Sequence, residues 1–128
     1  MTTRVALDTS ALMMPVQLDV RLFDELERVL DSYEPTAPQP VVEELRRLAE
    51  KGGTEGTAAN VGHDLAIERC LVVDTEASYA DDALVELARE GSVDYVVTND
   101  LPLRDRILER DVPVIALRGR NKLAITRP

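Results

Sequence analysis

The sequence predicts an α/β fold of three layers, in which a mainly parallel central sheet lies between two layers of helices. Short runs of aliphatic and β-branched residues alternate along the chain with longer segments whose apolar residues recur at helical spacing. Such alternation is typical of a parallel sheet joined by right-handed crossovers. With 128 residues and no linker or repeat, the chain is expected to form a single domain over residues 1–128.

The predicted elements follow from local signals. The strands are expected at residues 4–8, 71–73, 94–98 and 112–117, with a short second strand or extended link at 33–38 and an edge strand at 122–126. Ser10 is expected to cap the segment after the first strand, but Pro15 interrupts that segment, so the first helix is placed at 19–32. Further helices are expected at 41–51 after Pro40, at 54–69 after Gly52 and Gly53, at 79–89 with Ser78 as its cap, and at 100–110.

Composition excludes several classes of protein. No apolar run approaches the roughly 20 residues that cross a bilayer, and the N-terminus lacks the apolar core of a signal peptide. Cys70 is the single cysteine, so no internal disulfide can form and a cytoplasmic location is expected. One histidine and one cysteine also argue against a zinc site, so any metal must be held by oxygen.

Charge is distributed unevenly along the chain. The net charge is −9, yet residues 101–128 carry seven Lys or Arg against three Asp or Glu. Arg118, Arg120 and Lys122 surround Gly119 in this basic quarter and are the candidate contacts for RNA phosphates, with a solvated loop as the alternative. Aromatic residues make up only 3% of the chain, which argues against a stacking platform for bases.

Acidic side chains follow the strands at places that a sheet of this kind brings to one edge. Asp8 and Asp100 come directly after predicted strands, Glu43 and Glu44 lie early in one helix, and Asp81 and Asp82 lie in the first turn of another. Acids in a first turn also complement the helix dipole, so each alone is weak evidence for a site. Together they predict a site for Mg²⁺ or Mn²⁺, because converging carboxylates repel one another unless a cation intervenes. The pattern fits a phosphodiester-cleaving enzyme or a phosphatase with an aspartyl nucleophile.

Four segments, in order along nearly the whole chain, resemble the PIN-domain ribonucleases. They are Val5-Ala6-Leu7-Asp8-Thr9-Ser10, Val41-Val42-Glu43-Glu44-Leu45, Tyr79-Ala80-Asp81-Asp82-Ala83-Leu84-Val85 and Val97-Thr98-Asn99-Asp100-Leu101. The third segment and the ending Val114-Ile115-Ala116-Leu117-Arg118 look most like the archaeal VapC-like branch, which is similar to the PIN nucleases that process ribosomal RNA precursors.

The resemblance assigns catalysis and metal binding to one acid in each segment: Asp8, Glu44, Asp82 and Asp100. It prefers Glu44 to Glu43 because the family's acid precedes a leucine, and Asp82 to Asp81 because the family's acid precedes a small residue and an aliphatic pair. The remaining polar residues would support these acids, namely Ser10, Asp81, Thr98 and Asn99. Many members carry a further acid where this chain has Pro102, and Asp105 is a weak substitute.

The implied activity is metal-dependent hydrolysis of single-stranded RNA that leaves a 5′-phosphate, by either a toxin-like or an RNA-processing enzyme. The implied partners are RNA, an antitoxin protein if the chain is a toxin, and a second copy of the chain, with Leu12-Met13-Met14 as an apolar surface for a homodimer. A catalytically silent RNA-binding or scaffold module is the main alternative. The aspartyl phosphatase is weaker, because that chemistry calls for a second Asp where this chain has Ser10.

Overall fold

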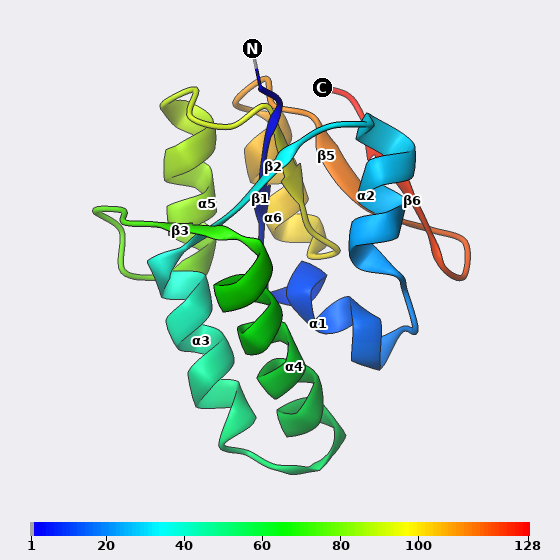
Figure 1. Ribbon diagram of the computed structural model, residues 1–128. Coiled ribbons are helices and arrows are strands. Elements are labelled where there is room, and N and C mark those ends of the chain that lie inside the picture. The colour runs from blue at the N-terminus through cyan, green and yellow to red at the C-terminus, as the bar shows by residue number, and fades with distance from the viewer. Residues whose placement is uncertain (1) are drawn as a thin grey trace.

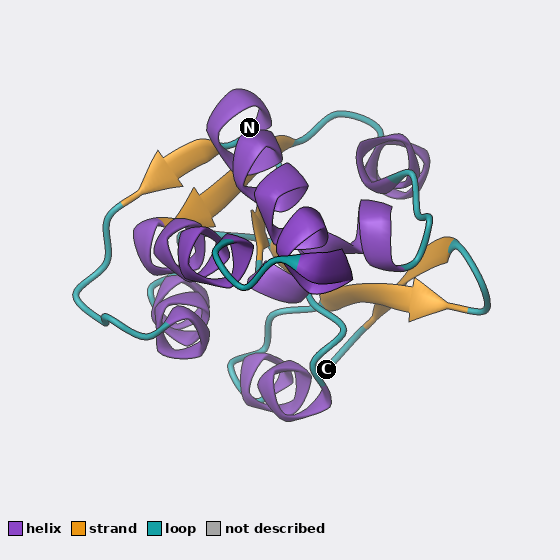
Figure 2. Cartoon of the chain, turned by 90° about the horizontal axis from the view of Figure 1, so that it is seen from below, coloured by secondary structure: helices purple, strands orange, loops and turns teal. Residues whose placement is uncertain are grey.

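The structure is a computed structural model that describes residues 2–128 and forms a six-stranded sheet with helices on both sides (Figures 1 and 2). No helix within residues 2–128 is long and apolar enough to cross a membrane. The elements, in chain order, are β1 (Arg4–Leu7), α1 (Thr9–Gln17), α2 (Leu22–Leu30), β2 (Glu34–Pro38), α3 (Gln39–Ala49), α4 (Gly53–Arg69), β3 (Leu71–Val73), α5 (Ala80–Arg89), β4 (Tyr95–Val97), α6 (Leu101–Leu108), β5 (Val114–Arg118) and β6 (Lys122–Thr126).

The strand order confirms the predicted fold class. The strands lie side by side as β3-β2-β1-β4-β5-β6; the first five are parallel, and β6 adds to the edge in the antiparallel direction. The extended segment at 33–38 is a true strand despite its prolines, because it pairs with β1 on one side and β3 on the other.

The chain changes direction across the sheet between β1 and β4. From β1 it moves outward through β2 to β3, whereas β4 is followed by β5 on the opposite side. The helices form two groups accordingly: α1 packs with α2, α3 and α4, and α5 packs with α6, while α3 and α5 join the two groups. In such sheets the crevice for a ligand forms beyond the carboxyl ends of the strands at this change of direction. Asp8 follows β1 and Asp100 follows β4, so both acids stand at that position.

The helix predicted at 19–32 is present as α2, but the prediction for the segment after β1 was wrong in two respects. Helix α1 runs through Pro15 to Gln17, and its cap is Asp8, whose side chain accepts a hydrogen bond from the Ala11 amide, rather than Ser10. A proline removes one backbone hydrogen bond, but the cost is offset where the helix is held by packing. Here the turn before Pro15 is buried, and α1 lies along α4.

Leu12, Met13 and Met14 are core residues, which corrects their assignment as a dimerisation surface. All three are at most 5% exposed. The approach of α4 leaves no room there, because a Cβ built at Gly62 would lie 2.8 Å from the Leu12 carbonyl oxygen. The first turns of α1, which carry the acid site, are therefore fixed against α4.

Helix α5 begins one residue later than predicted. Tyr79, rather than Ser78, occupies the capping position, and no side chain caps the helix. The Tyr79 carbonyl accepts the first helical hydrogen bond from the Ala83 amide at 2.9 Å. The result places Tyr79 at the entrance of α5, just before Asp81 and Asp82.

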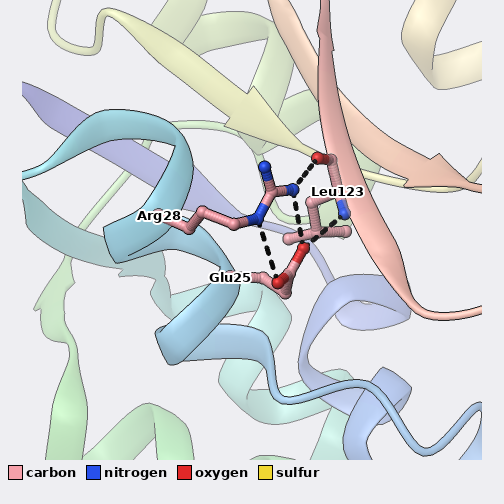
Figure 3. A network of polar contacts seen from close by, with 3 residues as sticks. All are labelled: Glu25, Arg28 and Leu123. Carbon is pink, nitrogen blue, oxygen red and sulfur yellow. Dashed lines mark hydrogen bonds and ion pairs between the residues drawn. The ribbon is translucent and has the colours of Figure 1, made fainter.

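A charged network ties α2 to the edge strand β6 (Figure 3). One carboxylate oxygen of Glu25 accepts hydrogen bonds from Arg28 at 2.8 Å and from the Leu123 amide at 2.9 Å. The Arg28 guanidinium also donates to the Leu123 carbonyl at 2.8 Å. The hydrogen bond from Arg28 is the main reason that the pKa of Glu25 falls from 4.5 to about 2.

Replacing Glu25 with glutamine is expected to lower stability and to remove part of its acid dependence. A carboxylate with a depressed pKa stabilises the fold above pH 4.5, and this contribution is lost as the pH falls toward 2. Because Arg28 is half exposed, we expect a loss of only about 1 kcal/mol near pH 7. Urea unfolding near pH 7 and near pH 3 would measure it, with Glu27→Gln on the same helix as control. Equal pH dependence in Glu25→Gln and the parent would contradict the prediction.

Candidate active site

Asp8 is a buried carboxylate at the carboxyl end of β1. It is 4% exposed, and its backbone amide donates to the Val97 carbonyl of β4. Burial raises the pKa of Asp8 from 3.8 to about 6, although hydrogen bonds from Thr98, the Ala11 amide and Ser10 act in the opposite direction. Within residues 2–128, the hydrogen bonds to Asp8 come from hydroxyl and amide groups and none from a basic side chain. The fold therefore holds a buried acid whose charge is not balanced by a positive charge.

Two hydroxyl groups orient Asp8 and connect it to the turn after β4. Ser10 donates to both carboxylate oxygens, at 2.8 and 3.0 Å, and accepts from the Asn99 amide at 3.1 Å. Thr98, which is fully buried, donates to the second oxygen of Asp8 and accepts from the Asp100 amide at 3.0 Å. The two acidic turns are thereby fixed to one another through hydroxyl groups.

Asp100 caps α6, with its side chain accepting from the Leu103 amide at 2.9 Å. Asn99, beside it, accepts with its side chain from the Leu117 amide at 2.9 Å and so joins this turn to the end of β5. Arg118 ends β5, Lys122 begins β6, and both are exposed together with Arg120 between them. Because β5 runs parallel to β4 and continues past it, the basic hairpin extends beyond the edge that carries the acids.

Of the two neighbouring acids on α5, Asp81 is the one whose charge interacts with the other site residues. Partial burial raises its pKa, and the carboxylates of Asp100 and Glu44 raise it further. Asp81 in turn raises the pKa of Asp8. Asp82 instead forms an ion pair with Arg106 of α6, at 2.9 Å, in which both side chains are about half exposed. The charge of Asp81 thus acts on Asp8 and responds to Glu44 and Asp100, whereas Asp82 pairs with Arg106.

The remaining candidate residues differ in burial and in their charged partners. Glu44 is partly buried and Glu43 is exposed. Asp105 is exposed and forms an ion pair with Arg104 at 3.3 Å on the surface of α6. Sequence reasoning missed Arg106, whose charge lowers the pKa of Asp81. Its only sequence signal is its place on a helix that begins at a site acid.

The oxygen-only donor set fits a hard divalent cation such as Mg²⁺ or Mn²⁺. Across residues 2–128, however, no three His, Cys, Asp or Glu side chains are close enough to form a ready-made ion site. Burial raises the pKa of Asp81, and repulsion by the carboxylates of Asp100 and Glu44 raises it further. Binding of a cation by these acids would require their side chains to move closer together.

In protein kept metal-free with a chelator, Asp8 is expected to make the fold less stable as the pH rises through 4 to 6. The folded chain retains the Asp8 proton up to about pH 6, whereas the unfolded chain loses it near 3.8. The folded state therefore binds more protons in this window, and the free energy of unfolding falls by on the order of 3 kcal/mol as the pH increases. Urea unfolding across this range would measure the effect. The variant Asp8→Asn should lack this component, and an unchanged pH profile in it would contradict the assignment.

Comparison with known proteins places the chain in a family. Residues 5–120 match the family described as PIN like domain. The chain belongs to the PIN domain family. It is 32% identical over 127 residues to ribonuclease VapC4 of Methanocaldococcus jannaschii, and the match covers 95% of each protein.

Solved structures agree with this membership. The PIN domain endonuclease Utp24 superimposes with a TM-score of 0.79 at 26% identity, covering 98% of this chain and 92% of that one. VapBC2 of Rickettsia felis, solved bound to a DNA fragment from its promoter, shares the fold with a TM-score of 0.64 at 13% identity, covering 89% of this chain and 98% of that one. The PIN family supports nuclease activity and a divalent metal for the chain, and it replaces the aspartyl phosphatase interpretation.

Proposed function

We propose that residues 1–128 form a single nuclease domain that hydrolyses phosphodiester bonds of single-stranded RNA with Mg²⁺ or Mn²⁺ and leaves a 5′-phosphate. The observation that carries the proposal is the buried, uncompensated Asp8 at the change of direction in the sheet, within reach of the charge of Asp81. A divalent cation bound there would supply water activation and stabilisation of the charge that develops on the phosphate.

The residues of the chain have distinct parts in this proposal. Asp8, Glu44, Asp81 and Asp100 would hold the cation, and Ser10 and Thr98 would keep Asp8 in position through their hydroxyl groups. Asp81 takes the part that motif position alone assigned to Asp82, because the charges of Glu44 and Asp100 act on Asp81. Asp82 would instead hold Arg106 beside the acids.

The substrate backbone must approach an acidic protein, so cations near the site have to attract it. Arg118, Arg120 and Lys122 on the β5–β6 hairpin would serve this purpose. The proposal is supported by Asn99, which links Leu117, beside the hairpin loop, to the turn that carries Asp100. Phosphate contacts of this kind weaken steeply with salt. We therefore expect RNA binding to depend strongly on ionic strength despite the net charge of −9.

The test is cleavage of a labelled single-stranded RNA by the purified chain with Mg²⁺, with Mn²⁺ and with a chelator. We expect metal-dependent cleavage whose downstream products carry a 5′-phosphate, shown by their degradation by a 5′-phosphate-dependent exonuclease. Binding of RNA without cleavage, at any metal concentration, would favour the silent RNA-binding module.

The physiological role has two candidates, a toxin and an RNA-processing enzyme, with the cytoplasm as the expected compartment for both. The relative named ribonuclease VapC4 favours a toxin with an antitoxin protein as partner. The likeness to the PIN domain endonuclease Utp24 supports endonuclease activity, which an RNA-processing enzyme also requires. Arrest of growth on expression of the parent chain, but not of an inactive variant, would support the toxin. A homodimer also stays a prediction, and light scattering at micromolar concentration would test it.

A further inference from the structure

Two large apolar side chains are exposed directly beside the acids of the candidate site. Tyr79 is 76% exposed and Leu101 is 59% exposed, the two highest values among the large hydrophobic residues that the structure describes. Tyr79 stands two positions before Asp81, and Leu101 follows Asp100. Each lies at the amino end of a helix, and these helices, α5 and α6, pack against one another.

The local structure gives no folding reason for either exposed side chain. Tyr79 occupies a helix cap, where Ser, Thr, Asp or Asn would satisfy a backbone amide, but its side chain makes no capping hydrogen bond. Leu101 leaves in water an apolar surface that stabilises a fold only when it is buried. Exposed apolar groups at the border of a polar site are typical of surfaces that contact a ligand.

The loop that carries Tyr79 is held in place by a buried acid. Glu86 of α5 is 8% exposed, and its two carboxylate oxygens accept from the backbone amides of Glu76 at 3.0 Å and Ala77 at 2.9 Å. The Thr75 hydroxyl closes the same turn by donating to the Ala77 carbonyl at 2.9 Å. A ligand that binds Tyr79 therefore meets an ordered loop and loses little affinity in ordering it.

We propose that Tyr79 and Leu101 contact the nucleobases on either side of the phosphate bound at the acids, and that Tyr79 does so by stacking. The inference rests on the proposed nuclease function and names the feature by which the site selects its substrate. A base can stack on a side chain only when its own face is free, so the two residues favour unpaired RNA over a duplex. Carboxylates repel the phosphate backbone, and base contacts supply affinity that does not depend on charge.

The chain offers a direct probe, because it has no tryptophan. Tyr79→Trp introduces a single one at the proposed contact, and combination with Asp8→Asn prevents cleavage. We expect a single-stranded oligonucleotide to quench its fluorescence and a duplex of the same sequence to leave it unchanged. The matched control is Ile67→Trp, also combined with Asp8→Asn, at a 54% exposed position near the carboxyl end of α4. Its fluorescence should respond to neither nucleic acid.

Cleavage kinetics give the second measurement. Tyr79→Ala should raise KM for single-stranded RNA by about fivefold or more, the effect of losing one stacked base, with kcat little changed. Tyr79→Phe should have the KM of the parent because it keeps the aromatic ring. Leu101→Ala should raise KM by less than Tyr79→Ala does. The preference for single-stranded RNA over the duplex should shrink in Tyr79→Ala.

Experiment can separate a failure of the base contact from a failure of the nuclease function. If labelled RNA binds the tryptophan variant, as seen by anisotropy, but its fluorescence and the KM of Tyr79→Ala stay unchanged, the base contact is overturned and the nuclease stands. If the parent neither binds nor cleaves RNA with metal present, the proposed function itself fails and the base contact fails with it.

Discussion

Asp8→Asn is expected to reduce metal-dependent RNA cleavage by more than about 100-fold, beyond the 10- to 100-fold typical of residues that only support a metal ligand. The substitution keeps the shape of the side chain and the acceptor for the Ala11 amide, but it removes the buried negative charge that a cation would neutralise. Initial cleavage rates over a range of Mn²⁺ concentrations would measure the loss.

The variant should remain folded, because removing an uncompensated buried charge does not destabilise the chelated protein at neutral pH. Circular dichroism and thermal unfolding would verify this. Asp105→Asn is the matched control, since Asp105 is an exposed acid that pairs with Arg104 on the surface of α6, and it should keep the parent rate. Cleavage by Asp8→Asn at the parent rate would remove Asp8 from the site.

Asp81→Asn and Asp82→Asn are expected to differ sharply, although the two residues are neighbours. Asp81→Asn should lower cleavage about as much as Asp8→Asn does. The reason is that the charge of Asp81 raises the pKa of Asp8, and the charges of Asp100 and Glu44 add to the effect of burial in raising the pKa of Asp81. Asp82→Asn should lower cleavage only about tenfold, at the low end of the 10- to 100-fold typical of a supporting residue, because it releases only the guanidinium of Arg106.

The pair is its own control, since both variants remove one carboxylate from the first turn of the same helix. Mn²⁺ titrations by calorimetry give a second readout, and only Asp81→Asn should weaken binding of the ion. The reverse order, with Asp82→Asn inactive and Asp81→Asn active, would return the metal ligand to the residue that motif position favours.

Much of the fold was predictable because its signals are local. The apolar runs of β1, β3 and β4 and the helical spacing of α3, α4 and α5 identify these elements within short windows of sequence. The start of α1 was not predictable in this way. Its continuation through Pro15 depends on burial of the preceding turn against α4, a helix more than thirty residues away in the chain.

The sequence by itself determined the sheet, its mainly parallel direction, and the strand ends at which Asp8 and Asp100 stand, because a strand that ends in a polar group is a local pattern. The different surroundings of Asp81 and Asp82 come only from the tertiary structure, in which Asp82 pairs with Arg106 and the charges of Asp100 and Glu44 act on Asp81. Adjacent residues on a helix point in directions about 100° apart. The one that faces the other acids depends on how α5 packs against α3 and α6, and that packing involves residues from the whole chain.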